Sequence, residues 1–150
     1  MKIEHITFDE ILPFWKILWS HIDFEITPKH PRLLLKGYDE RIIVNYNWKP
    51  TFFGVIKDDQ IVGVNSGFRT NDDQYRSRGL FVIPELRMNG IATKLLQAVY
   101  DQAKKEECKI IWSYPRYEAI HVYLKFGFQK VSCFETNEFG TNCYVIKRVK

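Results

Sequence analysis

One stretch decides the fold of this chain: Leu80-Phe81-Val82-Ile83-Pro84-Glu85-Leu86-Arg87-Met88-Asn89-Gly90-Ile91-Ala92. Its first four residues form an apolar run typical of a buried strand, which Pro84 ends because proline cannot donate to a sheet. Gly90 permits a tight turn, and the apolar residues that follow recur on one helical face, at Ile91, Leu95, Val99 and Ala103. The stretch therefore predicts a strand, a short loop and the start of a helix.

A helix start of this kind predicts an anion site. Its first backbone N–H groups lack partners within the helix and lie at the positive end of the helix dipole, where a phosphate binds well. Arg87 adds a positive charge beside them. The spacing is neither the dinucleotide fingerprint Gly-x-Gly-x-x-Gly nor a Walker loop, since no Gly-Lys-Ser/Thr occurs. A plain surface loop that carries an arginine is the alternative interpretation.

The length and composition predict one soluble domain spanning residues 1–150. The apolar fraction is 45%, the charged fraction is 27%, and the net charge of +4 suits an anionic cofactor. The basic residues are scattered, so we expect no nucleic-acid partner. No apolar run approaches the ~18 residues of a membrane span, and the polar start is unlike a signal peptide. We expect a cytoplasmic protein with no membrane partner, as a monomer or a homodimer.

The chain has three cysteines, Cys108, Cys133 and Cys143, without a Cys-x-x-Cys spacing. This pattern indicates neither a zinc site nor a disulfide framework, and we expect no metal. Cys133 and Cys143 could lie near each other across a hairpin, but we expect free, buried thiols in a reducing compartment.

The predicted elements alternate between strands and helices. Thr7-Phe8-Asp9-Glu10 has the form of a capping box and starts a helix. Asp58-Asp59 predicts a hairpin turn, and Gly127 ends a short helix that begins near residue 118. A helix links the strands at 76–83 and 109–113, which should therefore be parallel. Strands are expected at residues 2–6, 51–57, 60–69, 76–83, 109–113, 128–134 and 142–149, and a possible short helix at 41–46.

Two motifs in this order resemble the GNAT superfamily of acyl-CoA-dependent N-acyltransferases. Arg87, Gly90 and Ala92 match its signature Q/R-x-x-G-x-G/A, and the segment from Tyr123 to Phe128 is similar to its Tyr-x-x-x-Gly-Phe segment. The resemblance implies an α/β (α+β) GNAT-like fold. That fold is a mixed, mostly antiparallel twisted sheet of about seven strands, splayed between two central parallel strands, with about four helices.

The resemblance also implies acetyl-CoA (coenzyme A) as the cofactor. Its pantetheine would pair with the strand residues Phe81, Val82 and Ile83. Its pyrophosphate would lie on the loop residues Arg87, Met88, Asn89, Gly90, Ile91 and Ala92. A backbone N–H near Val82 would stabilise the oxyanion, and Tyr123 would protonate the leaving thiolate.

The implied function is an N-acetyltransferase that moves an acetyl group to a primary amine of a small molecule or peptide, by direct attack in a ternary complex. Two departures from the pattern accompany this. Arg116 stands where many members have an asparagine that helps to hold the cofactor. The general base is not identifiable, and Glu85, Asp72, Asp73, His121 and a water relay all remain candidates. The alternative function is a non-catalytic domain that binds acyl-CoA as a sensor or structural module.

Several residues keep a structural interpretation beside the functional one. Tyr123 could be a core tyrosine, Glu85 an exposed carboxylate and His121 a structural residue. Trp15 and Trp19 belong either to the core or to an acceptor pocket. Residues 20–50 match nothing specific and could shape the acceptor site. Acids in this segment would favour a cationic amine if they faced the site, and otherwise they face solvent.

Overall fold

A computed structural model of the chain describes residues 1–23, 25–29, 48–138 and 140–149. These residues form, in chain order, β1 (Lys2–His5), α1 (Phe8–Leu18), β2 (Thr51–Lys57), β3 (Gln60–Arg69), β4 (Gln74–Val82), a 3₁₀ helix (Pro84–Leu86), α2 (Ile91–Lys105), β5 (Ile110–Ser113), a second 3₁₀ helix (Tyr117–Ala119), α3 (Ile120–Phe126), β6 (Gln129–Lys130), β7 (Glu135–Asn137), β8 (Gly140–Asn142) and β9 (Val145–Arg148).

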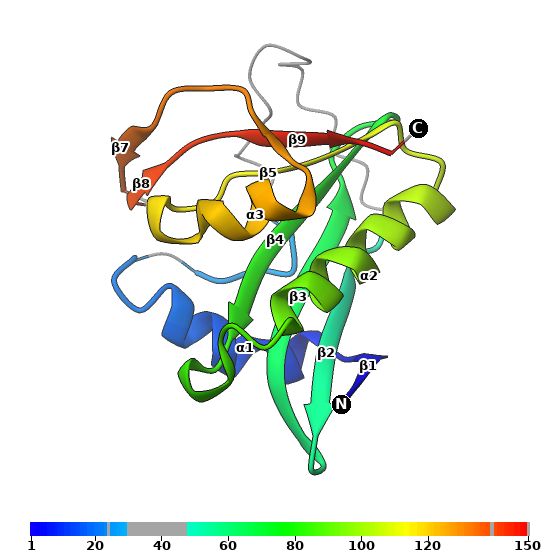
Figure 1. Ribbon diagram of the computed structural model, residues 1–150, viewed down its shortest axis with the longest axis vertical. Helices are drawn as coiled ribbons and strands as arrows, with labels where there is room; N and C mark the ends of the chain where they lie inside the picture. The colour runs from blue at the N-terminus through cyan, green and yellow to red at the C-terminus, as the bar shows by residue number, and fades with distance from the viewer. Residues whose placement is uncertain (24, 30–47, 139, 150) are drawn as a thin grey trace.

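The sheet has seven strands in the order β1-β2-β3-β4-β5-β9-β6, and β7 and β8 form a separate hairpin (Figure 1). All pairs in the large sheet are antiparallel except β4 and β5, which are parallel. The helix α2 connects these two strands, as the strand–helix–strand pattern predicts. This confirms the predicted mixed sheet around two central parallel strands.

Local sequence signals account for several element ends. The Glu10 N–H donates to the Thr7 hydroxyl at 3.1 Å, and the Thr7 N–H donates to the Glu10 carboxylate at 3.0 Å, which completes the predicted capping box. Asp58 and Asp59 adopt the left-handed φ values of 51° and 64° that a tight hairpin turn needs. Gly127 caps the end of α3 with φ 112°.

The helices cover the two faces of the sheet (Figure 1). On one face, Leu95, Val99 and neighbouring residues of α2 pack with the sheet and with α3 in the largest apolar cluster. On the other face, Ile11 and Trp15 of α1 pack against Val64 and Phe81. The sheet is therefore a middle layer, and the strands β4 and β5 near its centre are covered by helices.

The late strands are shorter than the sequence predicts. The predicted strand at 128–134 is reduced to the two exposed residues of β6, and the strand at 142–149 is shortened to β9, while Asn142 ends β8 of the separate hairpin. The Ser132 hydroxyl accepts a hydrogen bond from the Tyr144 N–H at 2.8 Å, so a side chain interrupts the backbone ladder there. The described residues contain three α-helices and not about four. The possible helix at 41–46 lies outside the described residues.

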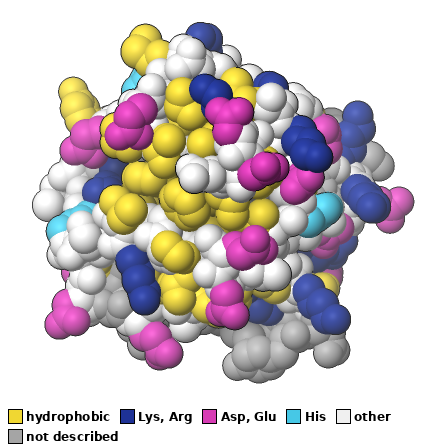
Figure 2. All heavy atoms as spheres, turned by 90° about the horizontal axis from the view of Figure 1, so that it is seen from below, with side chains coloured by type: hydrophobic (Ala, Val, Ile, Leu, Met, Phe, Trp, Pro, Cys, Tyr) yellow, Lys and Arg dark blue, Asp and Glu magenta, His cyan; other side chains and the backbone are white. Residues whose placement is uncertain are grey.

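All three cysteines are free, and Cys108 and Cys143 are buried as expected. Cys133 is exposed, so the expectation of a buried thiol was wrong there. No helix among the described residues has the length and apolar character to cross a membrane. Figure 2 shows one end of the molecule, where apolar side chains gather in the middle and acidic and basic side chains surround them.

Candidate active site between two splayed strands

A cleft opens where the two parallel strands separate. The β4–β5 pairing runs only from Gln74 opposite Ile110 to Arg76 opposite Trp112. On its other side, β4 pairs with β3 through Ser66 opposite Arg78 and then Val64 opposite Phe81, so β4 carries one extra residue at positions 79–80. Such a bulge bends a strand and often lies beside an active site. Here the bulge follows the part of β4 that pairs with its parallel neighbour.

The indole of Trp15 holds this bulge from the α1 side. Its Nε1–H donates to the Gly79 carbonyl at 2.9 Å, and Trp15 is fully buried. Gly79 has a left-handed φ of 83°, and a Cβ placed there would lie 2.1 Å from that same Nε1. Only glycine fits this turn, because any side chain would collide with the indole. Trp15 is therefore a core residue that positions the cleft.

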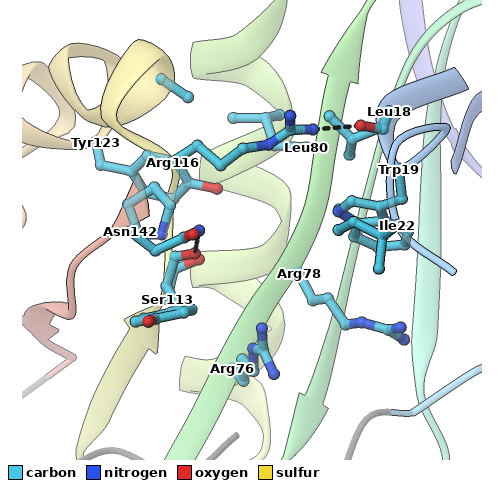
Figure 3. Close-up of a pocket in the computed structure, with 14 residues that line it drawn as sticks. Leu18, Trp19, Ile22, Arg76, Arg78, Leu80, Ser113, Arg116, Tyr123 and Asn142 are labelled. Atoms are coloured by element: carbon cyan, nitrogen blue, oxygen red, sulfur yellow. Dashed lines mark hydrogen bonds between the residues drawn. The ribbon is translucent and has the colours of Figure 1, made fainter. Parts of the chain in front are cut away.

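The cleft encloses about 640 Å³ of empty space, part of it open to solvent. Its walls come from the end of α1, from β4, from the segment after β5, and from α3 and β8 (Figure 3). The lining residues include Trp19, Ser113, Arg116, Tyr123 and Asn142. The sequence left open whether Trp19 belongs to the core or to a pocket, and the structure has it among the residues that line the cleft.

Tyr123 lies on α3, is 3% exposed and lines the cleft. Burial raises its pKa, while the hydroxyls of Ser113 and Ser77 and the positive charge of Arg76 oppose that shift. The phenol therefore keeps its proton at neutral pH. Its ring packs edge-on against Phe128, with the ring centroids 5.4 Å apart.

Buried hydroxyl groups fix the strands around Tyr123. Ser113 Oγ donates to the Ser77 carbonyl at 2.7 Å, which ties β5 to β4 where their pairing ends. Asn65 Nδ2 donates to Ser77 Oγ at 3.0 Å, and Ser66 Oγ donates to the Arg78 carbonyl at 2.6 Å. These bonds replace ladder contacts near the bulge and keep the cleft in one shape.

The predicted loop surrounds the start of α2. Gly90 is its N-cap with a φ of 78°, no side chain caps the helix, and no atom lies within 4 Å of a Cβ placed there. The first N–H groups of α2 therefore have no capping side chain, and the space beside Gly90 is open, which suits an anion. Arg87, Met88, Asn89 and Gly90 are exposed, Ala92 is half-buried and Ile91 is buried in the core.

The strand residues before the loop are all at the end of β4. Phe81 and Val82 are buried, and Ile83 is half-buried. Val82 lies opposite Gly63 in the sheet, and its carbonyl accepts a hydrogen bond from Arg87 Nε at 2.9 Å. The Arg87 side chain therefore folds back over the strand end, and its guanidinium carbon lies 5.5 Å from the Phe81 ring centroid.

Arg116 reaches across the mouth of the cleft (Figure 3). Its Nη2 donates to the Leu18 carbonyl at the end of α1, and its Nη1 lies 3.5 Å from His21 Nε2. Partial burial lowers its pKa, and the nearby Glu118 opposes that shift. In place of the asparagine of the family pattern, this arginine ties the segment after β5 to α1.

None of the four candidate bases lines the cleft. Glu85, Asp72, Asp73 and His121 are all exposed, and Asp73 lies 3.8 Å from Lys109 in a surface ion pair. The described acids of the 20–50 segment are exposed as well. No group of three or more possible metal ligands is found in the described part of the chain.

The sequence analysis missed Arg76 and Arg78, which lie two positions apart on β4 and line the cleft. Both are more than nine-tenths buried. The available signal was two charged residues, spaced as on one strand face, in a strand expected at the centre of the sheet. Charged residues are rarely fully buried unless they are paired, so this spacing indicates a functional role for the two arginines.

A mixed sheet splayed between two central parallel strands, with an open helix start after the first of them, defines a GNAT-like acyltransferase fold. The family model described as the acetyltransferase (GNAT) family matches residues 10–128. The chain therefore belongs to the acetyltransferase (GNAT) family.

Solved structures with low sequence identity share the whole fold. An aminoglycoside 6'-N-acetyltransferase complexed with coenzyme A is 12% identical with a TM-score of 0.72, over 100% of this chain and 98% of that one. A GNAT acetyltransferase from Staphylococcus aureus Mu50 is 17% identical with a TM-score of 0.71, over 99% of both chains. Ard1 from Thermoplasma volcanium is 14% identical with a TM-score of 0.72, over 99% and 97%. No curated protein gives a significant sequence match.

Proposed function

We propose that this protein is an N-acetyltransferase that moves an acetyl group from acetyl-CoA to a primary amine of a small molecule or peptide, in a ternary complex. The observation that carries the proposal is the protonated, buried Tyr123 in a cleft between splayed strands, next to an open helix start. Membership in the acetyltransferase family supports it. So does the likeness to a structure that was solved with coenzyme A bound.

The residues at the end of β4 and the start of α2 fit coenzyme A. The uncapped N–H groups after Gly90 and the charge of Arg87 suit a pyrophosphate, and the space around Gly90 lets it approach the backbone. We assign the pyrophosphate to Arg87, Met88, Asn89, Gly90, Ile91 and Ala92. We assign the pantetheine to the backbone of Phe81, Val82 and Ile83.

Acetyl-CoA supplies a thioester, which a neutral amine converts into an amide while coenzyme A leaves as a thiol. Tyr123 holds the proton that the departing sulfur takes up, and its raised pKa keeps that proton in place until it is needed. The backbone N–H near Val82 is the proposed donor to the carbonyl oxygen. The amine loses its own proton to water, since no described acid lines the cleft.

Two measurements test this function. Calorimetry should give a micromolar dissociation constant for acetyl-CoA. A thiol-reactive dye should then detect coenzyme A released when the protein is mixed with acetyl-CoA and a panel of amines, and mass spectrometry should detect the acetylated amine. Undetectable binding of every acyl-CoA would refute the proposal.

The second candidate is a non-catalytic domain that binds acyl-CoA. The observation in its favour is that none of the four candidate bases lies at the cleft. It predicts the same calorimetric binding but no release of coenzyme A above the rate of spontaneous hydrolysis with any amine. The amine panel therefore separates the two functions.

A further inference from the structure

Two buried arginines share one face of β4 at the base of the cleft. Arg76 and Arg78 are 5% and 3% exposed, and both line the cleft (Figure 3). They lie on the part of the strand before the bulge, whereas the proposed pantetheine site lies beyond it. The arginines therefore belong to the part of the cleft that is left for the acceptor.

Arg76 is the less satisfied of the two. Its Nε and Nη1 are buried and have no hydrogen-bond partner among the described residues. Its guanidinium carbon lies 5.0 Å from the centroid of the Trp112 ring, which offers a cation–π contact but accepts no conventional hydrogen bond. An arginine presents five N–H donors, so this group keeps donors available for a ligand.

Arg78 is held in place and still has a free donor. Its Nη1 donates to the Thr27 carbonyl at 2.7 Å, while Nη2 is buried without a partner among the described residues. Its guanidinium carbon lies 4.8 Å and 5.0 Å from the ring centroids of Trp15 and Trp19. The aromatic contacts fix its direction and exclude water from its surroundings.

No described carboxylate forms an ion pair with either guanidinium. Burial lowers the pKa of Arg76 to about 10, and burial together with the charge of Arg76 lowers the pKa of Arg78 to about 9. Both groups therefore stay charged at neutral pH. Two desolvated positive charges on one strand face are unfavourable unless an anion lies near them.

Asn142 adds a hydrogen-bond acceptor to the donors of the two arginines. Its Nδ2 donates to the Tyr114 carbonyl at 3.0 Å. Its Oδ1 is buried and has no hydrogen-bond partner in the described part of the chain. Asn142 lines the same cleft. The cleft thus offers donors for an anion and one acceptor oxygen for an N–H group.

We propose that the acceptor is an amine that also carries an anionic group, a carboxylate or a phosphate, which binds Arg76 and Arg78. This inference rests on the proposed acetyltransferase function and specifies its acceptor class. A guanidinium pairs with either oxyanion through two parallel N–H···O bonds, so both groups share the same recognition chemistry. A cationic amine without an anion would be repelled by the two arginines. Of the acids in the 20–50 segment, the two that the structure describes, Asp23 and Glu25, are exposed and do not line the cleft.

Matched pairs of amines test the acceptor class in the wild-type protein. Alanine is compared with ethylamine, which lacks only the carboxylate, and O-phosphoethanolamine with ethanolamine, which lacks only the phosphate. We expect kcat/KM to be at least about tenfold higher for the anionic member of one pair, as hydrogen bonds to charged groups allow. The pair that shows the preference identifies the anion. Equal rates within both pairs, or a preference for the members without an anionic group, would overturn the proposal.

The variant Arg76→Met tests whether the arginines cause the preference for amines that carry an anionic group. It should abolish the preference by lowering kcat/KM for the amine that carries the anionic group at least about tenfold, with less than a twofold change for its partner without that group. Arg148→Met, on the exposed end of β9, is the matched control and should keep the preference. Arg76→Gln repeats the test if the methionine variant does not fold. Retained preference in a folded Arg76 variant would contradict the assignment.

A binding readout keeps this inference separate from the proposed function. Thermal shift measures whether each amine raises the melting temperature in the absence of acetyl-CoA. The anionic amines should stabilise the wild type and Arg148→Met but not Arg76→Met. If this pattern appears without any acetyl transfer, the anion site stands and the enzymatic function fails. If transfer occurs and the anionic amines give no stabilisation and no rate preference, the anion site fails alone.

Discussion

The start of α2 and the base of the cleft are both suited to anions, but they are built in opposite ways. At the start of α2 the donors are backbone N–H groups beside an exposed arginine, around a glycine with open space on its outer side. At the base of the cleft the donors are two arginine side chains that are almost fully buried between aromatic rings. The first site belongs to a short segment of sequence, whereas the second exists only after distant segments have packed.

The two sites also differ in their energetics. Charges at the exposed loop are hydrated and screened by salt, so the loop binds an anion at little cost to the empty protein. The buried arginines have lost their water, and their charges repel each other within one cleft. An anion at the base of the cleft should therefore contribute both affinity and stability, whereas one at the loop contributes mainly affinity.

Two glycines with left-handed φ values give the sharpest contrast between these regions. We expect Gly79→Ala to lower the free energy of unfolding by about 3 kcal/mol, because the left-handed penalty adds to a collision with Trp15. Gly90→Ala keeps the left-handed penalty but meets no atom within 4 Å, so its loss should be only about 1 kcal/mol. Urea unfolding of both variants measures the difference.

Equal losses at the two glycines would contradict this comparison. They would mean that Trp15 and the bulge adjust easily, so that the cleft is not held rigidly by α1. A Gly79→Ala variant that unfolds cooperatively but fails to bind anionic amines would instead support the role of the bulge in placing the arginines.

The elements that the sequence predicted correctly are those whose signals lie within a few neighbouring residues. The strand, loop and helix from Leu80 to Ala92 and the hairpin at Asp58-Asp59 each depend on neighbours within a few residues, and the structure has them where they were expected. The cleft depends on Trp15, 64 residues away from Gly79, and on the register between β3 and β4. Neither can be read from spacing in one sequence, which is why the cleft itself could not be predicted.

The ends of the late strands were predicted wrongly for a related reason. Their apolar residues predicted two continuous strands, but Ser132 interrupts the ladder by bonding to the Tyr144 N–H. Such a side-chain bond competes with the backbone ladder, and it depends on how two distant segments align. Propensity therefore located the strands roughly and could not set their ends.

The variant Tyr123→Phe probes the chemistry of the cleft without changing its packing. We expect turnover to fall about 100-fold, the lower end of what a positioned acid contributes, while the dissociation constant of acetyl-CoA stays within twofold. The phenylalanine keeps the ring contact with Phe128, so stability should change little. Tyr100→Phe, on α2 and not among the residues that line the cleft, is the matched control and should keep wild-type turnover.

Unchanged turnover in Tyr123→Phe would show that Tyr123 is only a core residue. The pH profile gives an independent check. Because burial raises the pKa of Tyr123, the wild type should show no alkaline loss of kcat from this group below pH ~10, the ordinary tyrosine value. An alkaline limb below that pH that vanishes in Tyr123→Phe would contradict the assigned environment.

The variant Arg87→Glu tests whether the exposed loop and the buried cleft act independently. Charge reversal beside the start of α2 should weaken acetyl-CoA binding at least tenfold, about 1.4 kcal/mol, as measured by calorimetry. Arg148→Glu makes the same change in net charge on β9 and should leave that affinity within twofold, which excludes a general charge effect. Since the cleft arginines lie before the bulge and Arg87 lies beyond it, the ratio of kcat/KM between amines with and without an anionic group should be unchanged in Arg87→Glu. Unchanged acetyl-CoA affinity would remove Arg87 from the cofactor site, and a changed ratio would show that the loop and the cleft recognise one and the same ligand group.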